Sequence, residues 1–159
     1  MTDPKRSRED IVIFLCGVLA VVGVDRISKI FFTKLLSLNE SIALIKGVAH
    51  FTLVHNTGIA FGLFRDCGMV FIIIPLILTG LLVYNIYYYR HSERLSRTYI
   101  VAFSLILGGA IGNLFDRIVL GYVIDFIDLR VWPVFNIADS AITVGAVVIL
   151  FQCIPSSSK

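Results

Sequence analysis

The sequence predicts an all-α membrane protein with four transmembrane helices and a small extracytoplasmic β-sheet. Hydrophobic residues make up 57% of the chain, whereas soluble domains are usually about 45–50% apolar. Long segments without any charged residue alternate with short polar links. One longer connection has the alternating pattern of a strand. The length of 159 residues fits a single membrane domain, residues 1–159.

The predicted spans cover about 11–32, 68–89, 98–115 and 138–154. Each segment approaches the length of about 20 residues that crosses a hydrocarbon core of about 30 Å. The first span contains Asp25 and Lys29, which are i,i+4 neighbours on one helix face. We therefore expect this helix to continue through the pair, and to place it at a membrane boundary. No small-residue cleavage site follows the first apolar run, so we expect it to be retained as an anchor.

The distribution of Lys and Arg predicts the orientation of the spans. Basic residues are dense before the first span and in the link 90–97, and the tail ends in Lys159. Because basic loops remain in the cytoplasm, both termini and this link are expected there. The segments at about 33–67 and 116–137 are then extracytoplasmic.

The first outer segment predicts a strand rather than a helix. Residues 47–56 alternate in the way that strands do, and Asn56-Thr57-Gly58 is a turn signal. A small sheet on the outer membrane face fits this pattern. The polar residues at the ends of the spans then all lie at that same face.

Two aspartates, Asp125 and Asp139, lie in apolar strings near the outer boundary. Carboxylates are costly beside hydrocarbon, so they indicate a functional site. Two acids sharing a poorly solvated site ionise one at a time, which provides one acid and one base near neutral pH. Such a pair can activate water against a peptide carbonyl. Asp128 is an alternative to Asp125 for this role, and residue spacing in the sequence does not distinguish between the two.

The same polar residues also have structural interpretations that remain open. Asn136 and Asp139 fit a capping box at the start of the last helix. Asn56 fits a turn as well as a grip on an extended peptide backbone. For Asp116 and Arg117, a structural ion pair is favoured over a substrate-binding arginine.

Several other site classes are not supported by the sequence. His50 and His55 lie five residues apart and would face opposite sides of a strand, so neither a metal nor another cofactor is expected. No serine has a recognisable Lys or His partner for nucleophilic catalysis. No run of basic and aromatic residues suits nucleic acid, and the net charge is only +3.

Five strings in this order resemble the bacterial lipoprotein signal peptidases, also called type II signal peptidases. They are residues 25–29 (DRISK), 56–61 (NTGIAF), 112–117 (GNLFDR), 123–126 (VIDF) and 135–139 (FNIAD). They span nearly the whole chain, and we see no departure at a motif position.

The resemblance implies a membrane aspartic endopeptidase of the bacterial cytoplasmic (inner) membrane. Its substrates would be prolipoproteins, cut on the N-terminal side of a cysteine that carries a diacylglyceryl group. The fold implied is a four-helix transmembrane bundle whose small outer sheet cradles the substrate, with the active site at the outer face. Membrane lipid is the other expected partner.

The resemblance also implies a role for individual residues. It assigns catalysis to Asp125 and Asp139, which selects Asp125 over Asp128. The implied substrate-binding or supporting residues are Asn56, Asn113, Arg117 and Asn136, and the implied structural polar residues are Asp25, Lys29 and Asp116.

A protein of another class remains as an alternative, namely a non-enzymatic four-span membrane carrier or assembly factor. Its acids would serve only as helix caps and ion pairs. A carrier usually needs an ionisable residue at mid-membrane, and the middles of the last three predicted spans contain none.

Overall fold

The computed structural model describes residues 4–58 and 96–153, together with Ile73, Ile77, Gly80 and Tyr84. Apart from these four residues, the predicted second span lies outside the described residues. The described elements are three helices and three strands: α1 (Pro4–Leu35), β1 (Ser41–Ile45), β2 (Ala49–Asn56), α3 (Arg97–Leu120), β3 (Val123–Asp128) and α4 (Ile137–Cys153).

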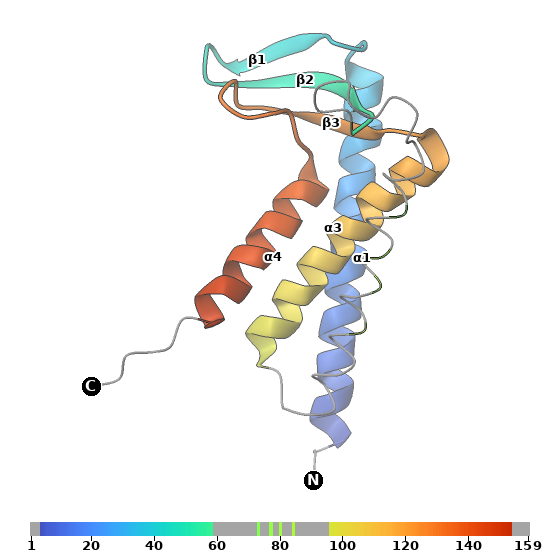
Figure 1. Ribbon diagram of the computed structural model, residues 1–159, viewed down its shortest axis with the longest axis vertical. Coiled ribbons are helices and arrows are strands. Elements are labelled where there is room, and N and C mark those ends of the chain that lie inside the picture. Colours follow the sequence, from blue (N-terminus) through green and yellow to red (C-terminus); the bar gives the residue numbers. More distant parts are fainter. Residues whose placement is uncertain are drawn as a thin grey trace, which may run out of the picture.

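The three helices extend from one side of the small sheet (Figure 1). The C-terminal end of α1, the C-terminal end of α3 and the N-terminal end of α4 all meet the sheet, and their other ends lie away from it (Figure 1). Helix α3 packs against both α1 and α4. The polar ends of the helices are therefore gathered into one layer beneath the strands.

Helix α1 runs without a break through Asp25 and Lys29, as predicted. The pair forms an ion pair, with 2.8 Å between Lys29 Nζ and Asp25 Oδ2. Helices α1 and α3 are both long and apolar enough to cross a membrane, whereas α4 is a shorter apolar helix over 137–152. Large apolar side chains on α1 are exposed, for example Leu19 and Ile27, each 70% exposed, which is the surface expected of a helix in contact with lipid.

Helix α3 continues to Leu120, beyond the predicted end of the third span at residue 115. The helix is therefore longer than the predicted span, and the expectation that an outer segment begins at about residue 116 stays a prediction. The Asp116 carboxylate within the helix is paired with the buried Lys29 and with the partly exposed Arg26. The helix ends at Gly121, which has a φ of 81° and donates its N–H to Arg117 O at 3.1 Å. Glycine tolerates this left-handed conformation.

The sheet is antiparallel, with strand order β1-β2-β3. Strand β2 confirms the strand predicted over 47–56. Val54 pairs with Asp125 and His50 pairs with Asp128, with a β-bulge in between. This pairing brings the string around residue 125 next to the predicted strand.

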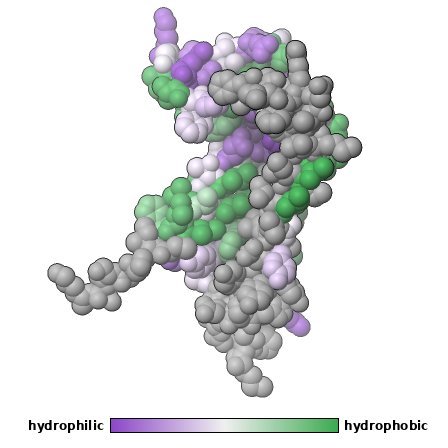
Figure 2. Space-filling model, in the orientation of Figure 1, coloured by the Kyte–Doolittle hydropathy of each residue, from purple (hydrophilic) through white to green (hydrophobic). Residues whose placement is uncertain are grey.

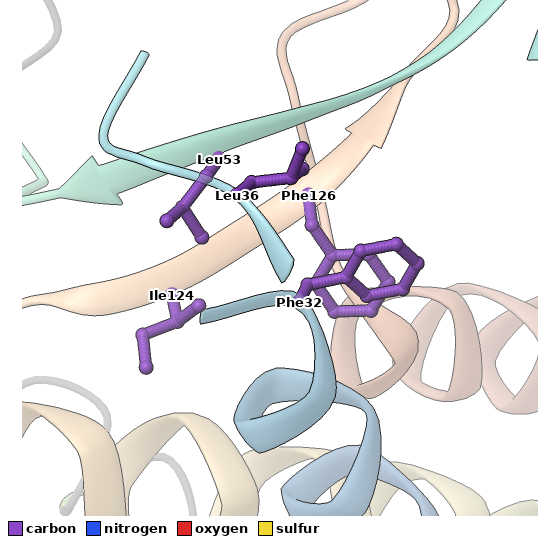
Figure 3. Packing of buried hydrophobic residues seen from close by; sticks show 5 residues of the cluster. All are labelled: Phe32, Leu36, Leu53, Ile124 and Phe126. Carbon is purple, nitrogen blue, oxygen red and sulfur yellow. The ribbon is translucent and has the colours of Figure 1, made fainter. Parts of the chain in front are cut away.

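A hydrophobic cluster packs the sheet against the C-terminal end of α1 (Figure 3). Its buried members are Phe32, Leu36, Leu53, Ile124 and Phe126. The Phe32 and Phe126 rings are stacked with centroids 4.3 Å apart. Burial of such side chains contributes about 1.5–3 kcal/mol each, so the sheet is held firmly on the helix ends.

Hydrophobic surface covers much of the helical part, and hydrophilic residues gather at the sheet and in the hollow beneath it (Figure 2). The polar residues of the predicted site belong to the layer where sheet and helices meet.

Candidate active site

Asp125 lies in the middle of β3 with only 1% of its surface exposed. Asn56 at the end of β2 donates from Nδ2 to Asp125 Oδ2 at 2.8 Å. Asn136 donates from Nδ2 to Asp125 Oδ1 at 2.7 Å. Burial raises the pKa of Asp125 from 3.8 to about 6, against the two amide hydrogen bonds, and the charge of Asp139 adds to the rise. Asp125 therefore exchanges a proton close to neutral pH.

Asp139 lies in the first turn of α4, where it forms the predicted capping box with Asn136. Asp139 N donates to Asn136 Oδ1 at 2.9 Å, and Asn136 N donates to Asp139 Oδ2 at 3.3 Å. The other carboxylate oxygen, Oδ1, accepts from Asn113 Nδ2 at 2.7 Å. The helix cap and the polar site are thus the same residues, and the two interpretations do not exclude each other.

Asn136 joins the two aspartates. Its side chain is fully buried. The amide nitrogen donates to Asp125 Oδ1, to Asn113 Oδ1 at 3.0 Å and more weakly to Ile124 O at 3.3 Å. The amide oxygen caps Asp139 N. One residue therefore contacts both carboxyl groups: its side chain binds that of Asp125, and its backbone N–H binds that of Asp139.

Beneath this site lies a buried ion cluster that links α1 to α3. Lys29 Nζ is 2.8 Å from both Asp25 Oδ2 and Asp116 Oδ2. The side chains of Lys29 and Asp116 are fully buried. The remaining Asp25 oxygen accepts from Ala138 N at 3.0 Å, which ties α4 into the cluster. Gly112 leaves room for it, because a Cβ there would lie 2.7 Å from Asp25 Oδ2.

Asp116 does take part in structural ion pairs, but the partner favoured from the sequence is wrong. Asp116 Oδ1 pairs with Arg26 Nη2 at 2.8 Å, and Lys29 takes the other oxygen. Arg117 instead donates from Nη1 to Asn113 O at 3.3 Å. The half-buried Arg117 guanidinium lies within electrostatic range of Asp139 and Asp125.

Arg26 was missed by the sequence analysis. Its guanidinium stacks over the Phe115 ring, 4.4 Å from the centroid, in addition to pairing with Asp116. The sequence could have indicated it, because Arg26 is adjacent to Asp25 on a helix that already contains one buried cation, Lys29. Its partner on α3 was not visible from spacing within α1.

Asp128 lies on the opposite face of β3 from Asp125, since the two positions are three apart in a strand. Thr52 Oγ1 donates to Asp128 Oδ2 at 2.7 Å, and Arg130 N donates to Oδ1 at 2.9 Å. These bonds lower the pKa of Asp128. The structure therefore does not bring Asp128 together with Asp139.

Asn56 and the histidines complete the surroundings. Besides donating to Asp125, Asn56 accepts Gly58 N at 2.8 Å, so it is both a turn residue and a site residue. The His55 ring stacks on Tyr122 with centroids 3.9 Å apart. Among the described residues, no group of three His, Cys, Asp or Glu side chains could hold a metal ion.

The chemistry open to this site is general acid–base catalysis. Two acids are held by one asparagine, and one of them has a pKa raised to about 6. Asp139 is half-buried. Such a pair can remove a proton from water and supply one to a carbonyl or amine.

Comparison with known proteins agrees with this geometry. A family model described as signal peptidase (SPase) II matches residues 17–155. A lipoprotein signal peptidase of Syntrophomonas wolfei is 46% identical over 138 residues, covering 86% of this chain and 89% of the relative. Another, from Halothermothrix orenii, is 42% identical over 133 residues, covering 84% and 89%.

A solved structure also matches. It is described as a bacterial membrane enzyme structure determined by the in meso method at 1.9 Å resolution. It has a TM-score of 0.80 and 30% identity, and the match covers 91% of this chain and 94% of that one. The fold is thus that of a membrane enzyme, and the non-enzymatic alternative is not favoured. The chain belongs to the signal peptidase II family.

Proposed function

We propose that this protein is a membrane aspartic endopeptidase that removes the signal peptide of prolipoproteins. It cuts on the N-terminal side of the diacylglyceryl-modified cysteine, and Asp125 and Asp139 are its catalytic residues. The observation that carries the proposal is that one buried residue, Asn136, binds both carboxyl groups, that of Asp125 through its side chain and that of Asp139 through its backbone N–H.

In the proposed reaction the two acids share one proton. Asp125 holds it, since burial raises the pKa of Asp125 to about 6. Asp139 is only half-buried, so it is the acid that we assign as the carboxylate base. Asp139 takes a proton from water, the resulting hydroxide adds to the scissile carbonyl carbon, and Asp125 protonates the carbonyl oxygen. Asp139 then passes its proton to the amine as the C–N bond breaks, and the gem-diol returns a proton to Asp125 as the carboxylic acid product forms.

Asn56 and Arg117 are proposed to hold the substrate next to the acids. Asn56 is exposed and already donates to Asp125, so its remaining amide hydrogen faces the place where a peptide backbone would lie. Arg117 is half-buried and offers further N–H donors near Asp139 and Asp125. Asn113 and Asn136 support the acids.

The proposed topology is a four-helix transmembrane bundle in the bacterial cytoplasmic membrane. The second helix is formed by the segment 68–89, both termini are cytoplasmic, and the sheet and site lie at the outer face. A substrate anchored by its own helix and lipid would then present its scissile bond at a constant depth. Reporter fusions test this: a fusion at Arg94 is expected to report cytoplasm and one at Ile45 the outer side, and the reverse would contradict the topology.

The catalytic assignment is tested with three matched carboxamide variants. Asp125→Asn and Asp139→Asn should each abolish cleavage of a diacylglyceryl prolipoprotein in detergent while the protein still accumulates in the membrane. Asp128→Asn, on the same strand but facing the other side, should retain cleavage. Cleavage by either of the first two variants would refute the assignment.

A further inference from the structure

Lys29 is a fully buried charged residue beneath the site, and its side chain is 0% exposed. An ammonium has three N–H donors, and here each has an acceptor: Asp25 Oδ2, Asp116 Oδ2 and Asn113 Oδ1. The first two are carboxylates. Two carboxylates carry more negative charge than one lysine can neutralise. Charge pairing therefore does not account for the third bond, which Lys29 donates to Asn113 Oδ1.

The third bond, together with one from Asn136, fixes which way the Asn113 amide points. Asn113 Oδ1 accepts from Lys29 Nζ at 3.1 Å and from Asn136 Nδ2 at 3.0 Å. Both partners can only donate. A flipped amide would place its NH₂ group against two donors, so the oxygen must face them. Asn113 Nδ2 is therefore directed at Asp139 Oδ1, at 2.7 Å.

This orientation in turn determines how Asp139 can act. Because Oδ1 receives an N–H, that oxygen cannot itself carry a proton toward Asn113. The other oxygen is held by the Asn136 backbone N–H. Donors from α3 and from its own helix cap thus hold the Asp139 carboxylate in one position. The donor from α3 is Asn113, which in turn accepts a hydrogen bond from Lys29.

We infer that Lys29 is a positioning residue for peptide cleavage, because its buried ammonium orients the Asn113 amide that holds Asp139. The inference rests on the proposed function. Lys29 does not touch the substrate. It acts through Asn113, one hydrogen bond removed from the carboxylate. Its positive charge also acts on the second acid, since it lowers the pKa of Asp125.

Arg26 offers a matched control. It is one turn from Lys29 on α1 and pairs with the same aspartate, Asp116, at the same 2.8 Å. In the described contacts its guanidinium binds Asp116 and Phe115 and does not reach Asn113. Arg26→Gln therefore removes a structural ion pair of the cluster and leaves the link to Asp139 intact.

The test uses the full-length enzyme in detergent and a synthetic diacylglyceryl prolipoprotein peptide. Lys29→Met is made together with Asp25→Asn, so that no carboxylate loses its only cation. This pair of changes is compared with Asp25→Asn alone. We expect kcat to fall by about 10²-fold, the loss typical of a small misplacement of a reacting group, with little change in KM. The limb of the pH profile that reports Asp125 should move to higher pH.

A third variant separates the hydrogen bond from the charge. Lys29→Gln with Asp25→Asn keeps an N–H donor for Asn113 but has no charge, so kcat should recover in part while the pH limb stays shifted. If the Met variant does not fold, kcat of the Gln variant decides: a kcat close to that of Asp25→Asn alone supports the inference, because the N–H donor to Asn113 is kept, and a loss of about 10²-fold overturns it.

The remaining outcomes separate this inference from the catalytic assignment. If Lys29→Met with Asp25→Asn loses no more activity, relative to Asp25→Asn alone, than Arg26→Gln loses relative to the parent, Lys29 is only structural and the inference is overturned. The catalytic pair would still stand, provided that Asp125→Asn and Asp139→Asn are inactive. If those two variants cleave, the proposed function fails whatever Lys29 does.

Discussion

Two polar networks share strand β3, one on each face, and each contains an aspartate. The buried network consists of Asp25, Lys29, Asn113, Asp116, Asp125, Asn136 and Asp139. The outer network consists of Ser41, His50, Thr52, Asp128 and Arg130. Both aspartates accept two hydrogen bonds. Their pKa values nevertheless move in opposite directions.

Both side chains are largely covered, and the difference lies in how far desolvation outweighs hydrogen bonding. Asp125 is enclosed beneath the sheet, and desolvation is the largest cause of its raised pKa. For Asp128 the Thr52 hydrogen bond is the largest cause, and it lowers the pKa. Arg130 beside it is 44% exposed, at 3.6 Å from the carboxylate. The same residue type three positions along one strand is therefore suited to proton transfer on one face and to structural hydrogen bonds on the other.

The largest expected contrast between the networks comes from removing a central hydrogen-bonding group. Asn136→Ala removes the side chain that binds the Asp125 carboxyl group and caps Asp139 N, and we expect cleavage to fall by about 10²–10³-fold, as when a positioned donor is lost. Loss of the cap and of buried bonds should also cost about 2–4 kcal/mol of unfolding free energy. Thr52→Val, the corresponding change in the outer network, should cost only about 0.5–1.5 kcal/mol and leave cleavage unchanged. Equal activity losses, measured with the prolipoprotein peptide, would contradict the contrast.

Packing around the buried network provides a second prediction. Gly112→Ala would place a Cβ 2.7 Å from Asp25 Oδ2, so we expect a loss of about 1–3 kcal/mol, typical of overpacking. Gly23→Ala is the control on α1, where a Cβ meets nothing within 4 Å, and it should gain about 0.5–1 kcal/mol from helix propensity. Thermal unfolding in detergent measures both. A Gly112→Ala protein as stable as the parent would show that the cluster adapts to added volume.

The two aspartates should also make stability depend on pH in opposite ways. The pKa of Asp125 is raised from 3.8 to about 6, so its contribution to stability is fully present below pH 3.8 and is lost as pH rises through about 6. A shift of this size corresponds to about 3 kcal/mol at most. The pKa of Asp128 is lowered, so its contribution is present above 3.8 and is lost as pH falls further. Comparing Tm against pH for the parent, Asp125→Asn and Asp128→Asn isolates each contribution, and two curves of the same sign would refute the difference.

The smallest effect concerns the coupling of the two acids. Because the charge of Asp139 raises the pKa of Asp125, Asp139→Asn should lower the pKa of Asp125. The carboxyl carbon chemical shift of Asp125, followed by NMR against pH, measures the change. Asp128→Asn should leave that titration in place. An unchanged pKa in Asp139→Asn would mean that the two acids titrate independently.

Parts of this arrangement could be predicted because they depend on local pattern. The alternation in 47–56 predicted β2, and the i,i+4 spacing predicted the contact of Asp25 with Lys29. The capping box at Asn136 and Asp139 was one of two interpretations left open, and the structure confirms it. These features concern residues close in sequence, where helix and strand geometry determines which side chains meet. The second span and the catalytic roles of Asp125 and Asp139 stay predictions.

What the sequence by itself determined is the set of apolar segments, the strand and, through its five ordered strings, the family. Which polar side chains pair with one another was decided only by the tertiary structure. Arg26 rather than Arg117 pairs with Asp116, and Asn113 lies between Lys29 and Asp139. These contacts join α1, α3 and α4, so they depend on how helices far apart in sequence pack together. The physical reason is that a buried charge or amide must find its donors and acceptors wherever the fold places them, and spacing within one segment carries no information about that choice.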